Sequence, residues 1–162
     1  ANHNHLQDLV EKFNIPFTCI SAEGLNREEH EDKMIAKINE YEPELIVLAK
    51  YMRILTSKFV ETFPKKVLNI HHSFLPAFIG ANPYKQAHER GVKIIGATAH
   101  YVTNDLDEGP IIFQDVVRVD HSYSWEDMRN AGRNVEKIVL SNAFEMLLND
   151  RVFVHGNKTV IL

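Results

Sequence analysis

Two polar residues at the end of an apolar run have the spacing that carbonyl chemistry needs. Asn69 and His71 stand two positions apart after the hydrophobic pair Val67-Leu68. Side chains alternate along a β-strand, so Asn69 and His71 project to the same side of it. An amide can donate a hydrogen bond to an oxygen that gains negative charge, and an imidazole can donate a second one or transfer a proton. The pair therefore predicts a site that acts on a carbonyl carbon.

Two further titratable residues lie downstream. His100 stands near the end of a second apolar segment, residues 94–102, and Asp107 lies in the polar loop that follows. A carboxylate in that place can orient and charge a histidine, or take a proton from water. We expect Asp107 to join Asn69 and His71 in one active site. His100 is expected beside them.

These residues also have purely structural interpretations. Asn69 could cap a helix, and His71 or His72 could be a hydrogen-bonded surface histidine. Asp107 could be a turn residue before Gly109. The same imidazoles and carboxylate are possible metal ligands, but the close paired spacings of a zinc site are not found in the sequence. We therefore predict no metal.

The elements that must position these residues alternate between strand and helix. Hydrophobic periodicity and turn residues predict helices over residues 6–13, 27–41, 57–62, 83–90 and 125–149, and strands over residues 17–20, 45–48, 67–70, 94–102 and 111–119. Gly156-Asn157 lies between two short apolar segments and predicts a C-terminal hairpin. This rhythm is typical of an α/β fold with an open, mostly parallel sheet and helices on both faces. Ligand sites in such sheets lie beyond the carboxyl ends of the strands.

The start of the chain departs from this plan. A doubly wound domain normally opens on a strand and a glycine-rich turn, whereas here the first expected element is a helix. We therefore expect the first strand to be missing and the domain to be incomplete at its N-terminus. The loss of a central strand would expose an apolar sheet edge, which further copies of the chain would cover. A homo-oligomer is expected on this ground.

Composition excludes several classes of partner. The 162 residues suffice for one domain, and the net charge is 18 − 22 = −4 with histidine neutral, so nucleic-acid binding is not expected. No apolar segment approaches membrane-spanning length. The single cysteine, Cys19, cannot form an internal disulfide, which indicates a reducing, cytoplasmic location. Its apolar neighbours predict a buried thiol.

Four motifs in a fixed order allow a more specific interpretation. They are Met52-Arg53-Ile54-Leu55, then Asn69-Ile70-His71-His72-Ser73-Phe74-Leu75-Pro76, then Gly96-Ala97-Thr98-Ala99-His100, and finally Asp105-Leu106-Asp107-Glu108-Gly109-Pro110. Their order strongly resembles the formyltransferase family that uses 10-formyltetrahydrofolate. The resemblance covers nearly the whole chain from about residue 17 onward. It implies a Rossmann-like formyltransferase fold and one catalytic domain over residues 1–162.

The resemblance also implies roles for the polar residues. In this family catalysis is assigned to an Asn, a His and an Asp that match Asn69, His71 and Asp107. Asn69 and a protonated His71 would bind the formyl oxygen as it becomes an oxyanion. Asp107 would keep His71 charged and help to deprotonate an attacking water. His100 would support Asp107 or order that water, and N10 of tetrahydrofolate would be the leaving group.

Folate binding in this family uses backbone and apolar contacts beside the motifs. The resemblance implies a substrate site formed by Met52, Ile54, Leu55, Gly80, Val102, Thr103, Asn104 and Asp105. Arg53 could pair with the glutamate carboxylate of the folate, or simply be solvated. Met52 and Leu55 could instead be core residues. The folate is implied as the substrate, and no tightly bound cofactor is implied.

One position separates the branches of this family. Transferases usually carry proline where this chain has His72, and residues 71–81 look like the branch that hydrolyses 10-formyltetrahydrofolate to formate and tetrahydrofolate. That branch supplies formate for one-carbon metabolism and purine biosynthesis. Its members usually carry an N-terminal regulatory domain of the ACT type, which is not recognised in residues 1–162. Two alternatives stay open: formyl transfer to an amine such as glycinamide ribonucleotide, and a non-catalytic folate-binding module.

Overall fold

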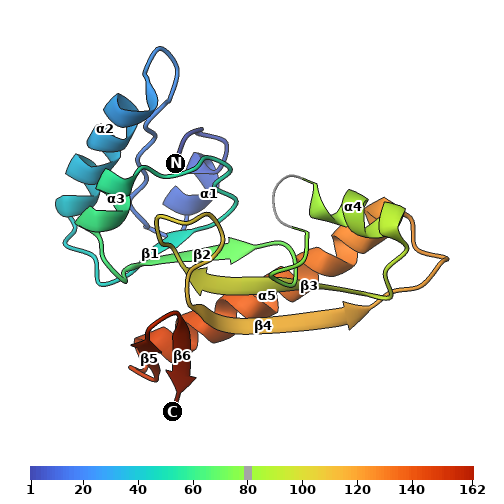
Figure 1. The fold of residues 1–162 in the computed structure, drawn as a ribbon. Coiled ribbons are helices and arrows are strands. Elements are labelled where there is room, and N and C mark those ends of the chain that lie inside the picture. The colour runs from blue at the N-terminus through green and yellow to red at the C-terminus, as the bar shows by residue number, and fades with distance from the viewer. Residues whose placement is uncertain (79–81) are drawn as a thin grey trace. The chain divides into compact units, whose positions relative to one another are not determined.

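The computed structural model of the chain describes residues 1–78 and 82–162 (Figure 1). These residues form two units, the first made of residues 1–44 and 54–63 and the second of residues 45–53 and 64–162. None of the described helices is long and apolar enough to cross a membrane.

Three helices make up the first unit: α1 (Gln7–Glu11), α2 (Arg27–Asn39) and α3 (Ser57–Thr62). Helix α2 begins with a capping box in which Asn26 and Glu29 satisfy each other's backbone N–H groups. Glu31 on α2 is buried, and its carboxylate accepts a hydrogen bond of 3.0 Å from the backbone N–H of Thr56, the N-cap of α3. This contact joins the two helices.

The segment of residues 17–20 differs from its prediction. It forms no strand, and its backbone bonds with Ala1: the Ala1 nitrogen donates to the Thr18 carbonyl, and the Ile20 N–H donates to the Ala1 carbonyl at 2.8 Å. Cys19 is exposed, so the predictions of a strand and of a buried thiol were wrong. A side chain with apolar neighbours in the sequence is buried only where its segment pairs in a β-sheet or packs into a hydrophobic core.

The second unit is built on a four-stranded sheet in the order β1-β2-β3-β4. Its strands are β1 (Ile46–Leu48), β2 (Val67–His71), β3 (Ile94–Tyr101) and β4 (Ile111–Arg118). Strands β1 and β2 are parallel, whereas β2–β3 and β3–β4 are antiparallel. The open sheet with helices is confirmed, but it is mixed where the sequence predicts mostly parallel strands.

The packing of α4 (Pro83–Arg90) goes with this difference. Helix α4 packs on α5 (Trp125–Leu148), and β3 enters the sheet from the end where β2 leaves it (Figure 1). Asn82 stands at the N-cap position of α4, but its side chain makes no cap hydrogen bond.

Helix α5 covers one face of the sheet. It begins with a capping box of Ser124 and Asp127 and packs along β2, β3 and β4 (Figure 1). Small residues of β3 let the helix approach closely. The core consists of Leu68, Ala97, Ala99, Tyr101, Ile112, Val135, Val139 and Ala143.

The C-terminal hairpin is confirmed as β5 (Val152–His155) and β6 (Lys158–Ile161). Two of its residues bond to the main sheet and its loop. Thr159 donates its hydroxyl to the Ile111 carbonyl, and the Asn157 amide donates to the Glu108 carbonyl at 2.9 Å. The hairpin thus braces the loop that carries Asp107.

Candidate active site

The pairing of β2 with β3 brings the first two elements of the site together. Asn69 stands opposite His100 in the ladder, and His71 stands opposite Thr98. Residues directly opposite each other share one face of a sheet. The Asn69 Nδ2 atom accordingly lies 3.3 Å from Nε2 of His100. The amide and the two imidazoles predicted from separate motifs therefore share one surface.

Asp107 reaches this surface from the loop between β3 and β4. Its backbone adopts a left-handed conformation with φ 57°, which aspartate tolerates better than most residues. One carboxylate oxygen lies 3.3 Å from His71 Nδ1 and the other lies 3.6 Å from His100 Nε2. All three side chains are more than nine-tenths buried, with exposed fractions of 6% for His71, 2% for His100 and 9% for Asp107.

A glycine fixes the return of this loop to the sheet. The Tyr101 N–H donates to the Pro110 carbonyl at 3.0 Å, which closes the loop at its base. Next to this bond, a Cβ atom added to Gly109 would lie only 1.8 Å from the Tyr101 carbonyl oxygen. No side chain fits there unless the backbone moves, so Gly109 sets the approach of the loop that places Asp107.

The two imidazoles determine the protonation state of Asp107. The pKa of the Asp107 carboxyl is held well below its usual range, because His100 and then His71 place ring nitrogens beside the ionised carboxylate. Burial acts in the opposite direction and is outweighed. Asp107 is therefore an anion at neutral pH.

His100 can interact with either Asn69 or Asp107. Its Nδ1 donates to the Tyr101 carbonyl at 2.9 Å, so Nε2 carries a proton only when the ring is charged. A neutral ring accepts from the Asn69 amide, and a charged ring donates toward Asp107. The 3.6 Å separation from Asp107 exceeds an ordinary hydrogen bond, so that contact is electrostatic.

One ring nitrogen of the site has no partner. His71 Nδ1 faces Asp107, whereas the buried Nε2 of His71 finds no hydrogen-bond partner among residues 1–78 and 82–162. Buried polar groups are rarely left unpaired unless they serve a ligand. With the Asn69 amide two positions away on the same strand face, this nitrogen can hold a carbonyl oxygen.

The turn after His71 is fixed by a residue that was not singled out in the sequence. Thr98 is fully buried, and its hydroxyl accepts from the Leu75 N–H at 3.0 Å and from the Gln114 amide at 2.8 Å. It also donates to the Ser73 carbonyl at 2.9 Å. The alternation of polar and apolar residues on β3 could have indicated an inward threonine, but its partners could not be read from the sequence.

The predicted folate-binding residues fall into both units. Val102, Thr103, Asn104 and Asp105 form the start of the Asp107 loop, where Val102 N–H donates to the Val67 carbonyl at 2.8 Å. Met52 is exposed and Arg53 half-buried in the second unit, while the exposed Ile54 and half-buried Leu55 belong to the first. Gly80 lies outside the described residues.

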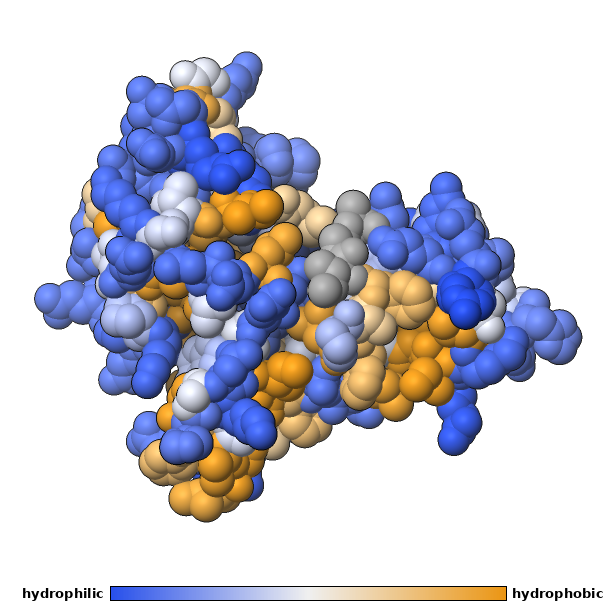
Figure 2. Space-filling model, in the orientation of Figure 1, coloured by the Kyte–Doolittle hydropathy of each residue, from blue (hydrophilic) through white to orange (hydrophobic). Residues whose placement is uncertain are grey.

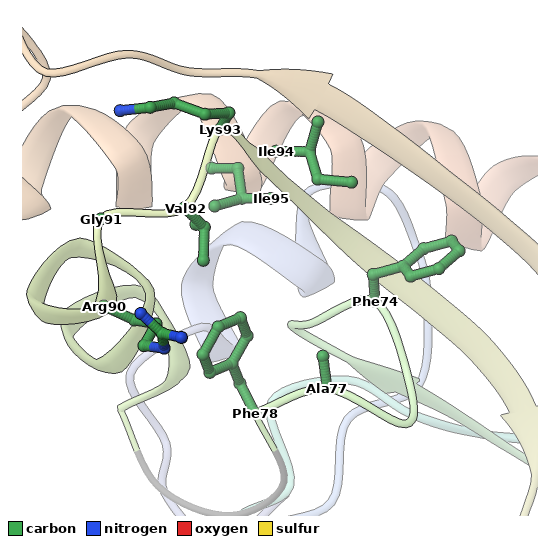
Figure 3. A pocket seen from close by; sticks show the side chains of 9 residues that line it. All are labelled: Phe74, Ala77, Phe78, Arg90, Gly91, Val92, Lys93, Ile94 and Ile95. Atoms are coloured by element: carbon green, nitrogen blue, oxygen red, sulfur yellow. The ribbon is translucent and has the colours of Figure 1, made fainter.

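A separate apolar hollow lies at the other end of β3. It encloses about 600 Å³, and Figure 3 shows Phe74 and Phe78 on its walls together with Ile94 and Ile95 at the start of the strand. Figure 2 shows apolar surface over this end of the sheet and over the β5–β6 hairpin. Exposed residues of these two areas include Phe74, Ile94, Val116, Phe153, Val160 and Leu162. The hollow contains none of the four polar residues described above.

Among the residues that the structure describes, no group of three or more His, Cys, Asp or Glu side chains is arranged to hold a metal ion. The carboxylate of Asp107 lies between the imidazoles of His71 and His100, at ion-pair distance from both.

Comparison with known proteins identifies the family of this site. A model of the formyl transferase family matches residues 2–144 of the chain. The chain belongs to this family. Its mixed, open sheet with helices is the fold of the solved formyltransferase-family structures that it matches.

Individual relatives show which members of this family the chain resembles. The chain is 65% identical to formyltetrahydrofolate deformylase of Escherichia coli O6:H1 over 162 residues, which is 100% of this chain and 58% of that protein. A crystal structure of a formyltetrahydrofolate deformylase from Pseudomonas syringae has a TM-score of 0.96 and 47% identity over 99% of this chain and 54% of that one. Glycinamide ribonucleotide transformylase 1 of Symbiobacterium toebii is more distant, with a TM-score of 0.90 and 32% identity over 96% of this chain and 74% of that one.

Proposed function

We propose that this chain carries the catalytic site of a formyltetrahydrofolate deformylase, which hydrolyses 10-formyltetrahydrofolate to formate and tetrahydrofolate. The observation that carries the proposal is the buried His71 ring, whose Nδ1 faces Asp107 and whose Nε2 has no hydrogen-bond partner among the described residues. The high identity to deformylases supports water as the acceptor of the formyl group. The chain spans 58% of the length of that relative. The activity of the whole protein is therefore part of what we propose.

The first step of the proposed reaction is attack on the formyl carbon. The formyl oxygen lies against His71 Nε2 and the Asn69 amide, and both donate hydrogen bonds to it as it gains negative charge. Donors that are already in place for a developing oxyanion are each worth about 3 kcal/mol of barrier in other acyl-transfer enzymes. Water forms the new C–O bond and gives a proton to Asp107.

A carboxylate with a low pKa is a weak base, and the contact with His71 changes this during the reaction. Before attack, the nearby imidazoles keep the carboxylate ionised and weakly basic. As the oxyanion forms beside the charged His71, it neutralises part of the positive charge that depresses the Asp107 pKa. The carboxylate therefore becomes a stronger base in the same step in which water must lose its proton.

The second step releases the products. The C–N bond to N10 of the folate breaks as the oxyanion collapses to formic acid, and N10 receives the proton that Asp107 took from water. Formic acid then releases its own proton to solvent and leaves as formate. His100, with one ring nitrogen fixed on the Tyr101 carbonyl, holds Asp107 and Asn69 in place during both steps. The loop of residues 102–105 and the pair Met52-Arg53, all in the second unit, are proposed to bind the folate.

The similarity to glycinamide ribonucleotide transformylase favours one second candidate, formyl transfer to an amine. Incubation of the purified protein with 10-formyltetrahydrofolate, with and without glycinamide ribonucleotide, separates the two. The proposal predicts formate at the same rate in both samples. Formylated amine in place of formate would establish the transferase, and folate binding without either product would leave a non-catalytic module.

A further inference from the structure

A row of rings continues from His71 toward α4. The His72 ring lies 5.5 Å from the His71 ring, centroid to centroid, and 5.9 Å from the ring of Tyr84 on α4. Tyr84 is buried, and its hydroxyl donates to the Glu136 carboxylate on α5 at 2.5 Å. The row therefore ties the catalytic imidazole to both helices of this side of the unit.

A glycine on α5 makes room for the row. A Cβ atom added to Gly132 would lie 2.2 Å from the Tyr84 hydroxyl oxygen and 2.3 Å from two ring carbons. Glycine within a helix costs about 0.5–1 kcal/mol relative to alanine. Here it lets the Tyr84 ring lie directly on the helix, next to the carboxylate of Glu136.

The surroundings keep the middle ring of the row uncharged. Burial lowers the pKa of His72, and the neighbouring His71 lowers it further, while Glu136 and Asp107 act weakly in the opposite direction. Of two adjacent imidazoles, only His71 faces a carboxylate at close range. A neutral imidazole offers one nitrogen lone pair, which can accept a hydrogen bond from water.

We propose that Tyr84, held by Glu136 over Gly132, is a positioning residue that keeps His72 against His71, and that His72 so placed orders the attacking water. The inference rests on the proposed hydrolase function and names what makes the site prefer water to an amine. His72 accepts a hydrogen bond from the water, whose proton still passes to Asp107 as the C–O bond forms. The bond changes of the reaction are unaltered.

Competition between water and an added nucleophile tests this inference. The protein is incubated with 10-formyltetrahydrofolate and hydroxylamine, and formate and formohydroxamate are measured together. For Tyr84→Phe we expect kcat for formate to fall about tenfold with a smaller change in KM, and the hydroxamate share to rise. The variant His72→Ala should shift the product ratio in the same direction.

Changes at Glu136 test the positioning step without altering a ring. Glu136→Gln keeps an oxygen that accepts from Tyr84, so it should retain the wild-type product ratio, whereas Glu136→Leu should behave like Tyr84→Phe. Tyr123→Phe is the matched control, because Tyr123 packs against the same apolar cluster as Tyr84 but is not part of the row. It should leave kcat and the product ratio unchanged.

The possible results distinguish a failure of this inference from a failure of the proposed hydrolase function. Wild-type product ratios in Tyr84→Phe, His72→Ala and Glu136→Leu overturn the inference, even where kcat falls, since a merely structural role would lower turnover without changing the acceptor. No formate from the wild-type protein overturns the proposed function instead. Should Tyr84→Phe fail to fold, the comparison of Glu136→Gln with Glu136→Leu decides.

Discussion

His71 Nδ1 lies 3.3 Å from the carboxylate of Asp107, and both side chains are almost completely buried. One residue comes from the end of β2 and the other from the loop after β3, so only the fold brings them together. The contact orients the imidazole ring, and the other ring nitrogen, Nε2, has no hydrogen-bond partner among the described residues. It is therefore the contact on which the proposed chemistry depends most.

The first prediction concerns the charge of this contact. Asp107→Asn keeps the shape of the side chain but removes the carboxylate, so it should lower kcat for formate release by about 100-fold or more. Tetrahydrofolate binding should change by roughly twofold or less, because the lost interaction acts in the transition state. Formate release and calorimetric titration with tetrahydrofolate measure the two effects.

A neighbour in the same loop provides the control. Glu108 is exposed, and Glu108→Gln removes one negative charge close to Asp107 without touching the imidazoles. It should keep turnover near the wild-type value. Near-normal turnover in Asp107→Asn itself would contradict the assignment of Asp107.

The second prediction concerns acid stability. The folded-state pKa of Asp107 is lowered from 3.8 by His100 and His71, so its stabilising contribution is present above that value and is lost as the pH falls through the folded-state pKa. The wild-type protein should therefore exceed Asp107→Asn in free energy of unfolding at about pH 5, and the excess should shrink from about pH 4 downward. Urea unfolding of both proteins across this range measures it. An excess that stays constant below pH 4 would argue against an ionised, paired Asp107.

Much of the scaffold could be predicted from the sequence. Helix α5 has strong periodicity and a capping box, and β2, β3 and β4 are apolar runs bounded by turn residues, so local patterns were sufficient. The direction of β3 could not be predicted in this way, because it depends on where α4 packs and not on the residues of β3 itself. The segment of residues 17–20 shows the same limit, since its apolar pattern lacks a ladder partner.

The residues of the polar site likewise divide into those that the sequence indicated and those that only the packing of the fold brings together. Asn69 and His71 share a strand, so their common direction followed from alternation alone, and the motif order brought in His100 and Asp107. The row from His72 through Tyr84 to Glu136 joins three elements, and only the packing of α4 on α5 reveals it. Thr98 was hidden for a similar reason, because its three hydrogen bonds reach two other segments.

The third prediction tests the support of the turn after His71. Thr98→Val keeps the volume but leaves the Leu75 N–H and the Ser73 carbonyl without their partner, at a cost of about 2–4 kcal/mol in the free energy of unfolding. Thermal unfolding should shift downward by roughly 5–15 °C. Thr62→Val is the control, because its hydroxyl bonds to the Lys58 carbonyl on an exposed helix face. A Thr98→Val protein as stable as the control would show that the turn is held by other contacts.

The fourth prediction links the backbone to catalysis. In Gly109→Ala the new Cβ would lie 1.8 Å from the Tyr101 carbonyl oxygen, where real Cβ atoms stay beyond 3.0 Å, so the loop must retreat by at least 1.2 Å (3.0 − 1.8 Å). A displacement of about 1 Å at a catalytic group costs on the order of 100-fold in rate. We therefore expect turnover to fall by that order, together with a loss of about 1–3 kcal/mol in stability from overpacking.

A second glycine separates the effect on the site from the effect on folding. Gly24 has a positive φ of 73° and open space around it, so Gly24→Ala introduces backbone strain of about 1–2 kcal/mol far along the chain from the motifs. It should lower the melting temperature and leave kcat unchanged. If Gly109→Ala showed the same pattern, with stability lost and turnover intact, the loop would tolerate movement and the tight approach at Tyr101 would not be what places Asp107.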